Sequence, residues 1–149
     1  MKSTANGYFF AAREHLLRAD EFFRSEREDR DYLTHYFSGL AVECVLRAYL
    51  RKQTDEFDSS HSLLHLAHRA NFYDLVPVKK VEEYATIMAE LTRRWNANHR
   101  YFSASDVKTH LHDLKADADQ KGEQFRNNAR YALVQATEIV RLGERKWEK

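Results

Sequence analysis

The stretch AVECVLRAYL, residues 41–50, decides the fold of this protein. It lies inside a longer segment, residues 31–53, whose apolar side chains occupy most of the helical circumference rather than one stripe. A helix of that kind is stable only where other elements cover it on nearly all sides, so we expect it at the centre of the molecule. The apolar positions that carry this prediction are Tyr36, Leu40, Val42, Cys44, Val45, Leu46 and Tyr49.

Helical patterns also fill the chain on both sides of this segment, with apolar residues three and four positions apart. Short connections between five to six helices predict one all-α domain, residues 1–149, folded as an antiparallel helical bundle. The first predicted helix runs from a cap at Ser3 or Thr4 to about Ser25, and after a solvated turn, Glu26–Asp31, the second is Asp31–Gln53. A polar loop, Thr54–Ser60, leads to a helix His61–Ala70 capped by Ser60, and the connection Asn71–Pro77 leads to a helix opened by Pro77 that loses its pattern near Asn98. A further helix runs from Ser103 or Ser105 to about Ala116, and after a break at Gly122 the last helix is Glu123–Trp147.

Composition supports this fold and excludes several classes of protein. Four glycines and one proline in 149 residues are too few for a turn-rich β architecture. Cys44 is the only cysteine, which excludes an internal disulfide and a cysteine-rich zinc site. The sequence has no apolar run of about 20 residues and its start lacks the layout of a signal peptide, so we expect a cytoplasmic protein without a membrane segment. A net charge of +1 means that any nucleic-acid binding must come from a local patch.

The densest polar cluster is RRWNANHRY, residues 93–101, at the end of an apolar helical pattern. Cleavage of RNA without a metal needs a group that handles the proton of the 2′-hydroxyl and a cation that stabilises charge on the phosphate. Histidine titrates near neutral pH and suits the first task, whereas arginine stays charged and offers a planar fork for phosphate. Arg94 and His99 are therefore the candidate pair.

The spacing of this pair sets a geometric condition. Five residues correspond to roughly 140° around a regular helix, so Arg94 and His99 cannot share one face of it. Either the helix ends between them, or the working site combines residues from two chains, as in a symmetric dimer.

These residues resemble a known family. Arg94-x4-His99-x-Tyr101 is similar to the Arg-x4-His-x-Tyr motif of HEPN toxins from HEPN–minimal nucleotidyltransferase toxin–antitoxin pairs. AVECVLRAYL, residues 41–50, looks like the second HEPN helix, and SHSLLHL, residues 60–66, is similar to a histidine-containing stretch of the family. The resemblance implies a HEPN-like bundle that acts as a homodimeric, metal-independent endoribonuclease on RNA, with catalytic Arg94 and His99. It also implies that a nucleotidyltransferase antitoxin modifies Tyr101 with AMP.

Four further residues are predicted to support this site. Arg93, Asn98 and Arg100 flank the pair in sequence. Glu43 stands within an apolar run, where an unpaired carboxylate is costly. It either orients Arg94 or another motif arginine, or lies at a partly exposed edge of its helix.

Trp95 supports an alternative function. Active members of the family usually have a polar residue directly after the arginine, whereas Trp95 followed by Arg100 and Tyr101 resembles HEPN domains without nuclease activity. The resemblance then implies a non-catalytic module that binds a nucleotide or a protein partner.

A metal site is not expected. His61, His65 and His68 fall at i, i+4 and i+7, a spacing that could bind zinc. No cysteine or carboxylate on the same predicted helix completes that site, so the sequence predicts neither a metal nor a cofactor.

Overall fold

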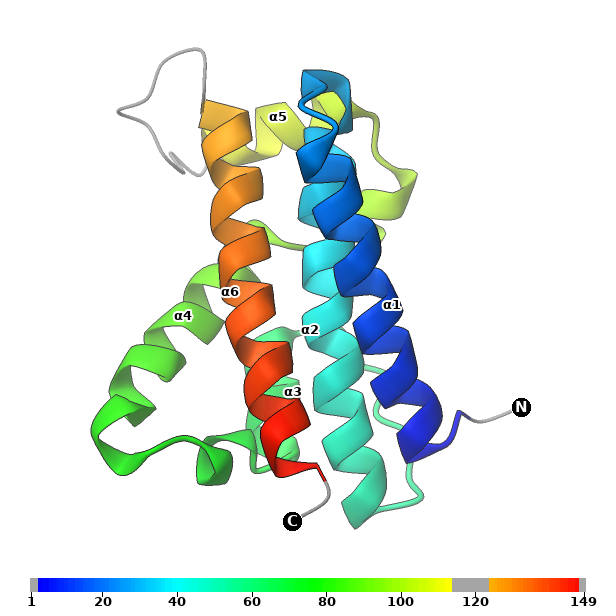
Figure 1. The fold of residues 1–149 in the computed structure, drawn as a ribbon, viewed down its shortest axis with the longest axis vertical. Helices are drawn as coiled ribbons and strands as arrows, with labels where there is room; N and C mark the ends of the chain where they lie inside the picture. The colour runs from blue at the N-terminus through cyan, green and yellow to red at the C-terminus, as the bar shows by residue number, and fades with distance from the viewer. Residues whose placement is uncertain (1–2, 114–123, 148–149) are drawn as a thin grey trace.

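The structure is a computed structural model that describes residues 3–113 and 124–147. The described residues contain six α-helices and four 3-10 segments, with no strand among them, which confirms the all-α prediction (Figure 1). The α-helices are α1 (Ala5–Arg24), α2 (Asp31–Gln53), α3 (Leu63–Arg69), α4 (Val81–Arg94), α5 (Ala104–Asp113) and α6 (Gln124–Lys146). The 3-10 segments are η1 (Glu28–Arg30), η2 (Phe72–Leu75), η3 (Val78–Lys80) and η4 (Ala97–Tyr101).

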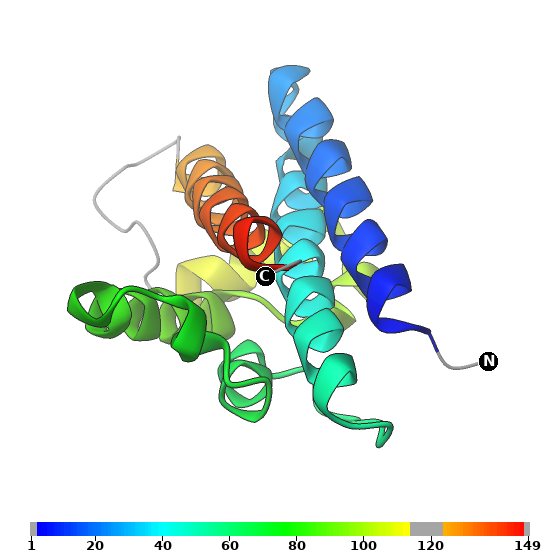
Figure 2. The same ribbon diagram turned by 60° about the horizontal axis from the view of Figure 1, so that its bottom comes forward.

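Three long helices form the body of the molecule. α1 and α2 run antiparallel and side by side, and α6 packs along α2 on the other flank (Figure 1). α3 and α4 lie beyond α2 and α6, with α4 leaning away from the long helices (Figure 2). α2 therefore has neighbours on most sides, as its nearly uniform apolar pattern requires.

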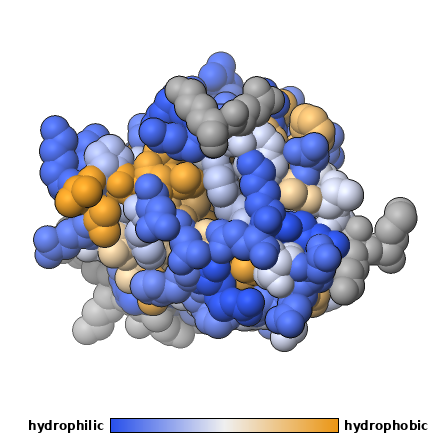
Figure 3. All heavy atoms as spheres, turned by 90° about the horizontal axis from the view of Figure 1, so that it is seen from below, coloured by the Kyte–Doolittle hydropathy of each residue, from blue (hydrophilic) through white to orange (hydrophobic). Residues whose placement is uncertain are grey.

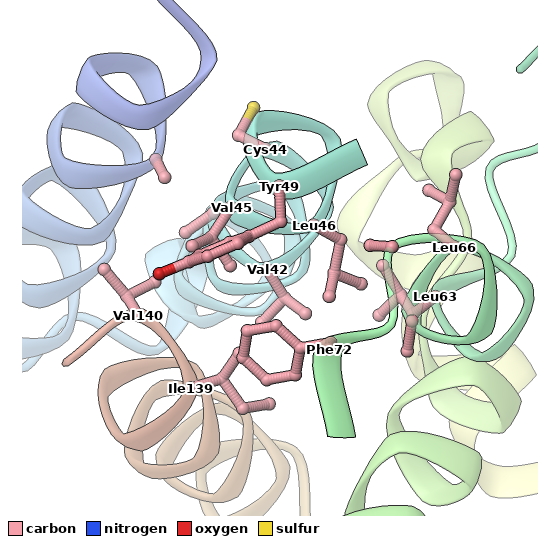
Figure 4. Close-up of a cluster of buried hydrophobic side chains, with 14 of the residues drawn as sticks. Val42, Cys44, Val45, Leu46, Tyr49, Leu63, Leu66, Phe72, Ile139 and Val140 are labelled. Carbon is pink, nitrogen blue, oxygen red and sulfur yellow. The ribbon is translucent and has the colours of Figure 1, made fainter. Parts of the chain in front are cut away.

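The core is built around α2. All ten residues of the stretch 41–50 are buried, including the one free thiol of the described residues, Cys44. Apolar side chains from the other elements meet this helix on several sides (Figure 4). The largest contributors at this centre are Val42, Val45, Leu46, Leu63, Leu66, Phe72, Ile139 and Val140.

The C-terminal end of α6 is fixed to α1 and α2. Trp147 stacks on Phe9 at 4.7 Å between ring centroids, and the ammonium of Lys52 lies 3.7 Å from the centroid of the indole. The hydroxyl of Tyr49 donates to the carbonyl of Gly143. A Cβ at Gly143 would lie 2.7 Å from a methyl group of Val45, so the close approach of α6 to α2 depends on this glycine.

The bounds of α1 and α2 agree with the prediction, but the start of α3 does not. Ser60 was expected to cap a helix that begins at His61, whereas α3 begins at Leu63. The cap is Ser62, whose hydroxyl accepts from the amide of His65 at 3.3 Å. Ser60 instead accepts from the amide of Ser62, which shapes the turn before the helix.

α4 differs from the prediction at both ends. Pro77 does not open it, because the 3-10 segment η3 comes first and α4 begins at Val81. The helix ends at Arg94 rather than near Asn98, since the next residue, Trp95, is extended. The connection expected over Asn71–Pro77 contains the 3-10 turn η2, and the turn after α1 contains η1.

α5 is capped by Ser103, one of its two predicted caps. The Ser103 hydroxyl accepts from the amide of Asp106, and the Asp106 carboxylate accepts from the amide of Ser103. The predicted end near Ala116, the break at Gly122 and the start of the last helix at Glu123 lie outside the described residues.

Thr4 is predicted to contribute to stability through the cap of α1. Its side-chain oxygen accepts from the amide of Gly7 at 2.9 Å, so Thr4→Ala should lower the free energy of unfolding by about 1 kcal/mol. Urea denaturation measures this loss, with the exposed Ser3→Ala as the matched control. Equal losses from the two substitutions would contradict the assignment of the cap to Thr4.

The face seen in Figure 3 is mostly polar, with a limited apolar patch. Exposed large apolar residues of the described chain include Phe10 and Leu17 on α1 and Val78 on η3. Among the described helices, none combines the length and the apolar character that crossing a membrane requires.

Candidate functional site

The end of α4 separates Arg94 from His99. Arg94 is the last residue of the helix, Trp95 is extended, and His99 lies in the 3-10 segment η4. Of the two geometries that the five-residue spacing allows, the chain therefore adopts the one in which the helix ends between the pair. A single chain can bring both residues toward the same neighbours.

Trp95 fixes the position of this turn. Its indole is buried, and the indole N–H donates to the carbonyl of Tyr36 on α2 at 3.0 Å. It packs directly on the backbone of Gly39, where a Cβ would lie 2.2 Å from three indole atoms. The tryptophan that departs from the nuclease motif thus anchors η4 against α2.

Arg94 and His99 are joined by a continuous line of hydrogen bonds, which we call the polar line. Arg94 Nη1 donates to Asn128 Oδ1 at 3.3 Å. Asn128 Nδ2 lies 2.9 Å from His35 Nδ1, and His35 Nε2 lies 3.1 Å from His99 Nδ1. The four side chains come from α4, α6, α2 and η4, so the tertiary fold assembles the line.

Arg94 is held at the outer end of the polar line. Its Nε donates to Glu90 at 2.6 Å, and its guanidinium carbon lies 4.4 Å from the centroid of the Tyr131 ring. The side chain is 11% exposed. Arg93 is bound to the same Glu90 but is more exposed, and its hydrogen bonds, followed by those of Arg94, lower the pKa of the Glu90 carboxyl.

His99 and His35 form the buried inner end. His99 is 2% exposed, and burial, followed by the charge of His110, lowers its pKa to about 4. Burial is also the main reason why the pKa of His35 falls to about 3, with smaller contributions from His99, His110 and Arg94. Both imidazoles are therefore neutral at pH 7.

The second ring nitrogen of His99, Nε2, lies outside the polar line. Within the described part of the chain, His99 Nε2 is buried and has no hydrogen-bond partner. The rings of Phe102 and His110 lie next to the imidazole, at 5.2 and 5.3 Å between ring centroids. A buried imidazole nitrogen without a partner is unfavourable and needs an explanation, of which a catalytic or ligand-binding role is one.

The flanking residues lie outside the polar line. Asn98 is exposed, and its backbone amide donates to the side chain of Asn96. The guanidinium of Arg100 lies 4.7 Å from the centroid of the Tyr101 ring, which is 74% exposed. These residues surround the site without contributing a hydrogen bond to its line.

Glu43 is not the partner of Arg94, and it is not at a partly exposed edge, so neither interpretation from the sequence was correct. The carboxylate is buried and accepts from Arg47 Nε at 3.1 Å, and its other oxygen lies 3.0 Å from His61 Nδ1. Arg47 also donates to the carbonyls of Asp58 and Ser60. Glu43 therefore stabilises the loop before α3.

The three histidines with zinc-like spacing are not assembled into a metal site. His61 precedes α3 and contacts Glu43, whereas His65 contacts Asp58 at 2.8 Å. Across residues 3–113 and 124–147, no three histidine, cysteine or carboxylate side chains are grouped so that they could hold a metal ion.

A separate pocket opens at the other end of α2. Its volume is about 330 Å³, and it contains no residue of the polar line. Its lining includes Tyr8, Arg47, Leu50, Arg51 and Phe57.

Sequence reasoning missed His35, Asn128 and Glu90. Asn128 carried a detectable signal, because it is a polar residue on an apolar helical stripe, three positions after Phe125 and four before Ala132. His35 carried no such signal, since the residues three and four positions after it are Ser38 and Gly39. A polar residue on an apolar stripe must find a buried partner, and Asn128 finds His35.

Comparison with known proteins does not assign this chain to a family. No family model, no curated protein and no solved structure matches the sequence or the fold.

Proposed function

We propose that this protein is a metal-independent endoribonuclease of the HEPN type, in which Arg94 and His99 act at the scissile phosphate of RNA. The observation that supports the proposal best is the polar line, which connects the two motif residues through Asn128 and His35. Buried polar side chains cost free energy, and a line that ends on an unpartnered imidazole nitrogen does not optimise stability. Perturbed titratable groups of this kind are typical of reactive sites.

The chemistry needs no metal. Attack of the 2′-oxygen on phosphorus forms one P–O bond and breaks the bond to the 5′-oxygen. The 2′-hydroxyl proton leaves to water and the 5′-oxygen takes up a proton, which gives a 2′,3′-cyclic phosphate and a 5′-hydroxyl end. Arg94 supplies a permanent positive charge for the phosphate, and His99 supplies a polar N–H or lone pair beside it.

Access to His99 requires a local opening. The ring is covered by Phe102 and by His110 of α5. α5 packs through a small cluster of Val107 and Leu111 with Phe125, separate from the main core. An element with few buried apolar contacts opens at lower free energy than the core, so we expect RNA to displace this cover.

The cleavage experiment compares wild type with His99→Ala and Arg94→Ala on single-stranded RNAs of varied sequence. Loss of either group should lower the rate at least about 100-fold. The matched controls are His68→Ala and Arg141→Ala, which remove an exposed histidine of α3 and an exposed arginine of α6. A wild type that cleaves none of the RNAs, or a His99→Ala variant that cleaves as fast as wild type, would contradict the proposal.

We further propose, from the resemblance to HEPN toxins, a homodimer that acts on RNA in the cytoplasm as a toxin. Tyr101 is exposed and could accept AMP from a nucleotidyltransferase antitoxin without unfolding of the site. Intact-mass measurement after incubation with such an enzyme and ATP would detect the modification. Tyr101→Phe is the control, because it lacks the acceptor hydroxyl.

A second function is favoured by the burial of His99 and Trp95. If the cover over His99 stays closed, the domain is a non-catalytic module that binds a nucleotide or a protein partner. In that case wild type and His99→Ala behave alike toward RNA, and calorimetric titration with nucleotides detects binding instead.

A further inference from the structure

Arg94 determines which atom donates and which atom accepts in each hydrogen bond of the polar line. A guanidinium has only N–H donors, so the side chain of Asn128 must turn its oxygen toward Arg94 Nη1. The amide nitrogen of Asn128 then faces His35 Nδ1 at 2.9 Å. An amide nitrogen only donates, so His35 Nδ1 carries a lone pair and the proton of the neutral ring is on Nε2.

The protonation of His35 in turn determines which nitrogen of His99 is the acceptor. His35 Nε2–H donates to His99 Nδ1 at 3.1 Å. The backbone N–H of Asn96 points to the same atom at 3.4 Å. Two N–H groups from different elements therefore face His99 Nδ1, which must be an acceptor. The proton of neutral His99 is then on Nε2, the atom that has no partner in the described residues.

We infer that His35 and Asn128 are positioning residues that hold His99 as its Nε2–H tautomer, so that His99 meets its ligand as a hydrogen-bond donor. The group that it recognises is an acceptor oxygen, and in RNA this is a non-bridging oxygen of the scissile phosphate. This inference rests on the proposed function for the identity of the ligand, but the tautomer follows from the geometry alone.

A role as proton acceptor is incompatible with the intact line. His99 Nε2 could take the proton of a 2′-hydroxyl only if it carried a lone pair, and the ring proton would then have to move to Nδ1. That atom already receives the N–H groups of His35 and Asn96. His99 therefore stabilises charge on the phosphate without transferring a proton, as an oxyanion-hole donor does.

Nitrogen-15 NMR of the imidazole rings tests the tautomers without any assay of activity. At pH 7 the wild type should show a protonated Nε2 and an unprotonated Nδ1 for both His35 and His99. Asn128→Asp replaces the donor that faces His35 by an acceptor, so His35 Nδ1 should become protonated. Asn127→Asp makes the same change of charge one residue away, off the polar line, and should leave both rings as in wild type.

Two NMR results would overturn the tautomer assignment. One is a wild-type His99 with its proton on Nδ1 or on both nitrogens at pH 7. The other is an Asn128→Asp protein whose His35 Nδ1 stays unprotonated.

Cleavage by His99→Gln tests the donor role separately. The side-chain amide of glutamine can donate from nearly the same place as imidazole Nε2, but it cannot act as a base. His99→Gln should retain at least about tenfold more activity than His99→Ala, because one such donor is worth about 100-fold or more. Equal loss of activity in the two folded variants would overturn the donor role. If the wild type cleaves no RNA while NMR finds the expected tautomers, the proposed function fails and the tautomer assignment stands.

Discussion

Acidification is expected to destabilise this protein strongly between pH 6.5 and pH 4, because His35 and His99 are buried as neutral rings. The pKa of His35 is lowered to about 3 and that of His99 to about 4, from an ordinary value of 6.5. Between pH 6.5 and the lowered pKa of each histidine, the unfolded chain binds more protons than the folded one. The free energy of unfolding that the neutral rings contribute above pH 6.5 is therefore lost as the pH falls. Two such groups account for a loss of up to ~4 kcal/mol by pH 5.

Urea denaturation at pH 7 and pH 5 measures this loss. The carboxyl groups with lowered pKa, such as those of Asp58 and Glu90, lose their contribution only at lower pH, so this window isolates the histidines. A protein with both His35→Gln and His99→Gln should show a much smaller difference between the two pH values, whereas His112→Gln should behave as wild type. An unchanged difference in the double variant would show that other groups cause the acid sensitivity.

Gly39→Ala is expected to lower the free energy of unfolding by about 3 kcal/mol, at the upper end of what overpacking of a core costs. The new Cβ would lie 2.2 Å from three atoms of the Trp95 indole, far inside the usual contact distance of about 3.5 Å. The indole is rigid, buried and bonded to the Tyr36 carbonyl, so it cannot rotate away cheaply. The turn that carries His99 must shift with it.

Gly7→Ala is the matched control for this substitution. Gly7 is also inside a long helix, but it is exposed and its added Cβ would meet only Thr4 Oγ1, at 3.1 Å. Its variant should be as stable as wild type or slightly more stable, since alanine favours the helix. A Gly39→Ala protein as stable as Gly7→Ala would mean that Trp95 does not pack on α2 as described. In a Trp95→Leu background the loss should shrink, because the atoms that clash are gone.

The helical architecture was predictable because its signals are local. The apolar pattern of residues 31–53 predicted the bounds of α2, and a cap at Ser3 or Thr4 predicted the start of α1, where the structure has Thr4. The end of α4 was harder to predict, since Arg93 and Arg94 are good helix formers and the residues after them carry no glycine or proline. The helix stops there because Trp95 must turn back to pack on Gly39, which is a tertiary contact.

The candidate site was predictable only in part. The motif identified Arg94 and His99, but the residues that connect them, His35 and Asn128, are 64 and 29 positions away from His99 in the chain. No spacing rule reaches that far, and only Asn128 stood out in the sequence, as a polar residue on an otherwise apolar stripe. Neither interpretation of Glu43 was correct, although its partner Arg47 lies only four positions away on α2, a spacing that places two side chains on one helix face. Its second contact, with His61, depends on the path of the loop before α3.

The single cysteine gives this protein a built-in reporter of its own opening motions. Cys44 lies in the middle of the buried stretch of α2, and burial raises the pKa of its thiol to about 12. A thiol-specific reagent can therefore modify it only in molecules whose core has come apart. Cys44 belongs to the main core cluster, whereas α5 packs through the separate cluster of Val107, Leu111 and Phe125. If a binding partner uncovers His99 and the labelling rate of Cys44 stays unchanged, the partner acts by local opening. If the labelling rate of Cys44 rises, the partner uncovers His99 by loosening the whole bundle.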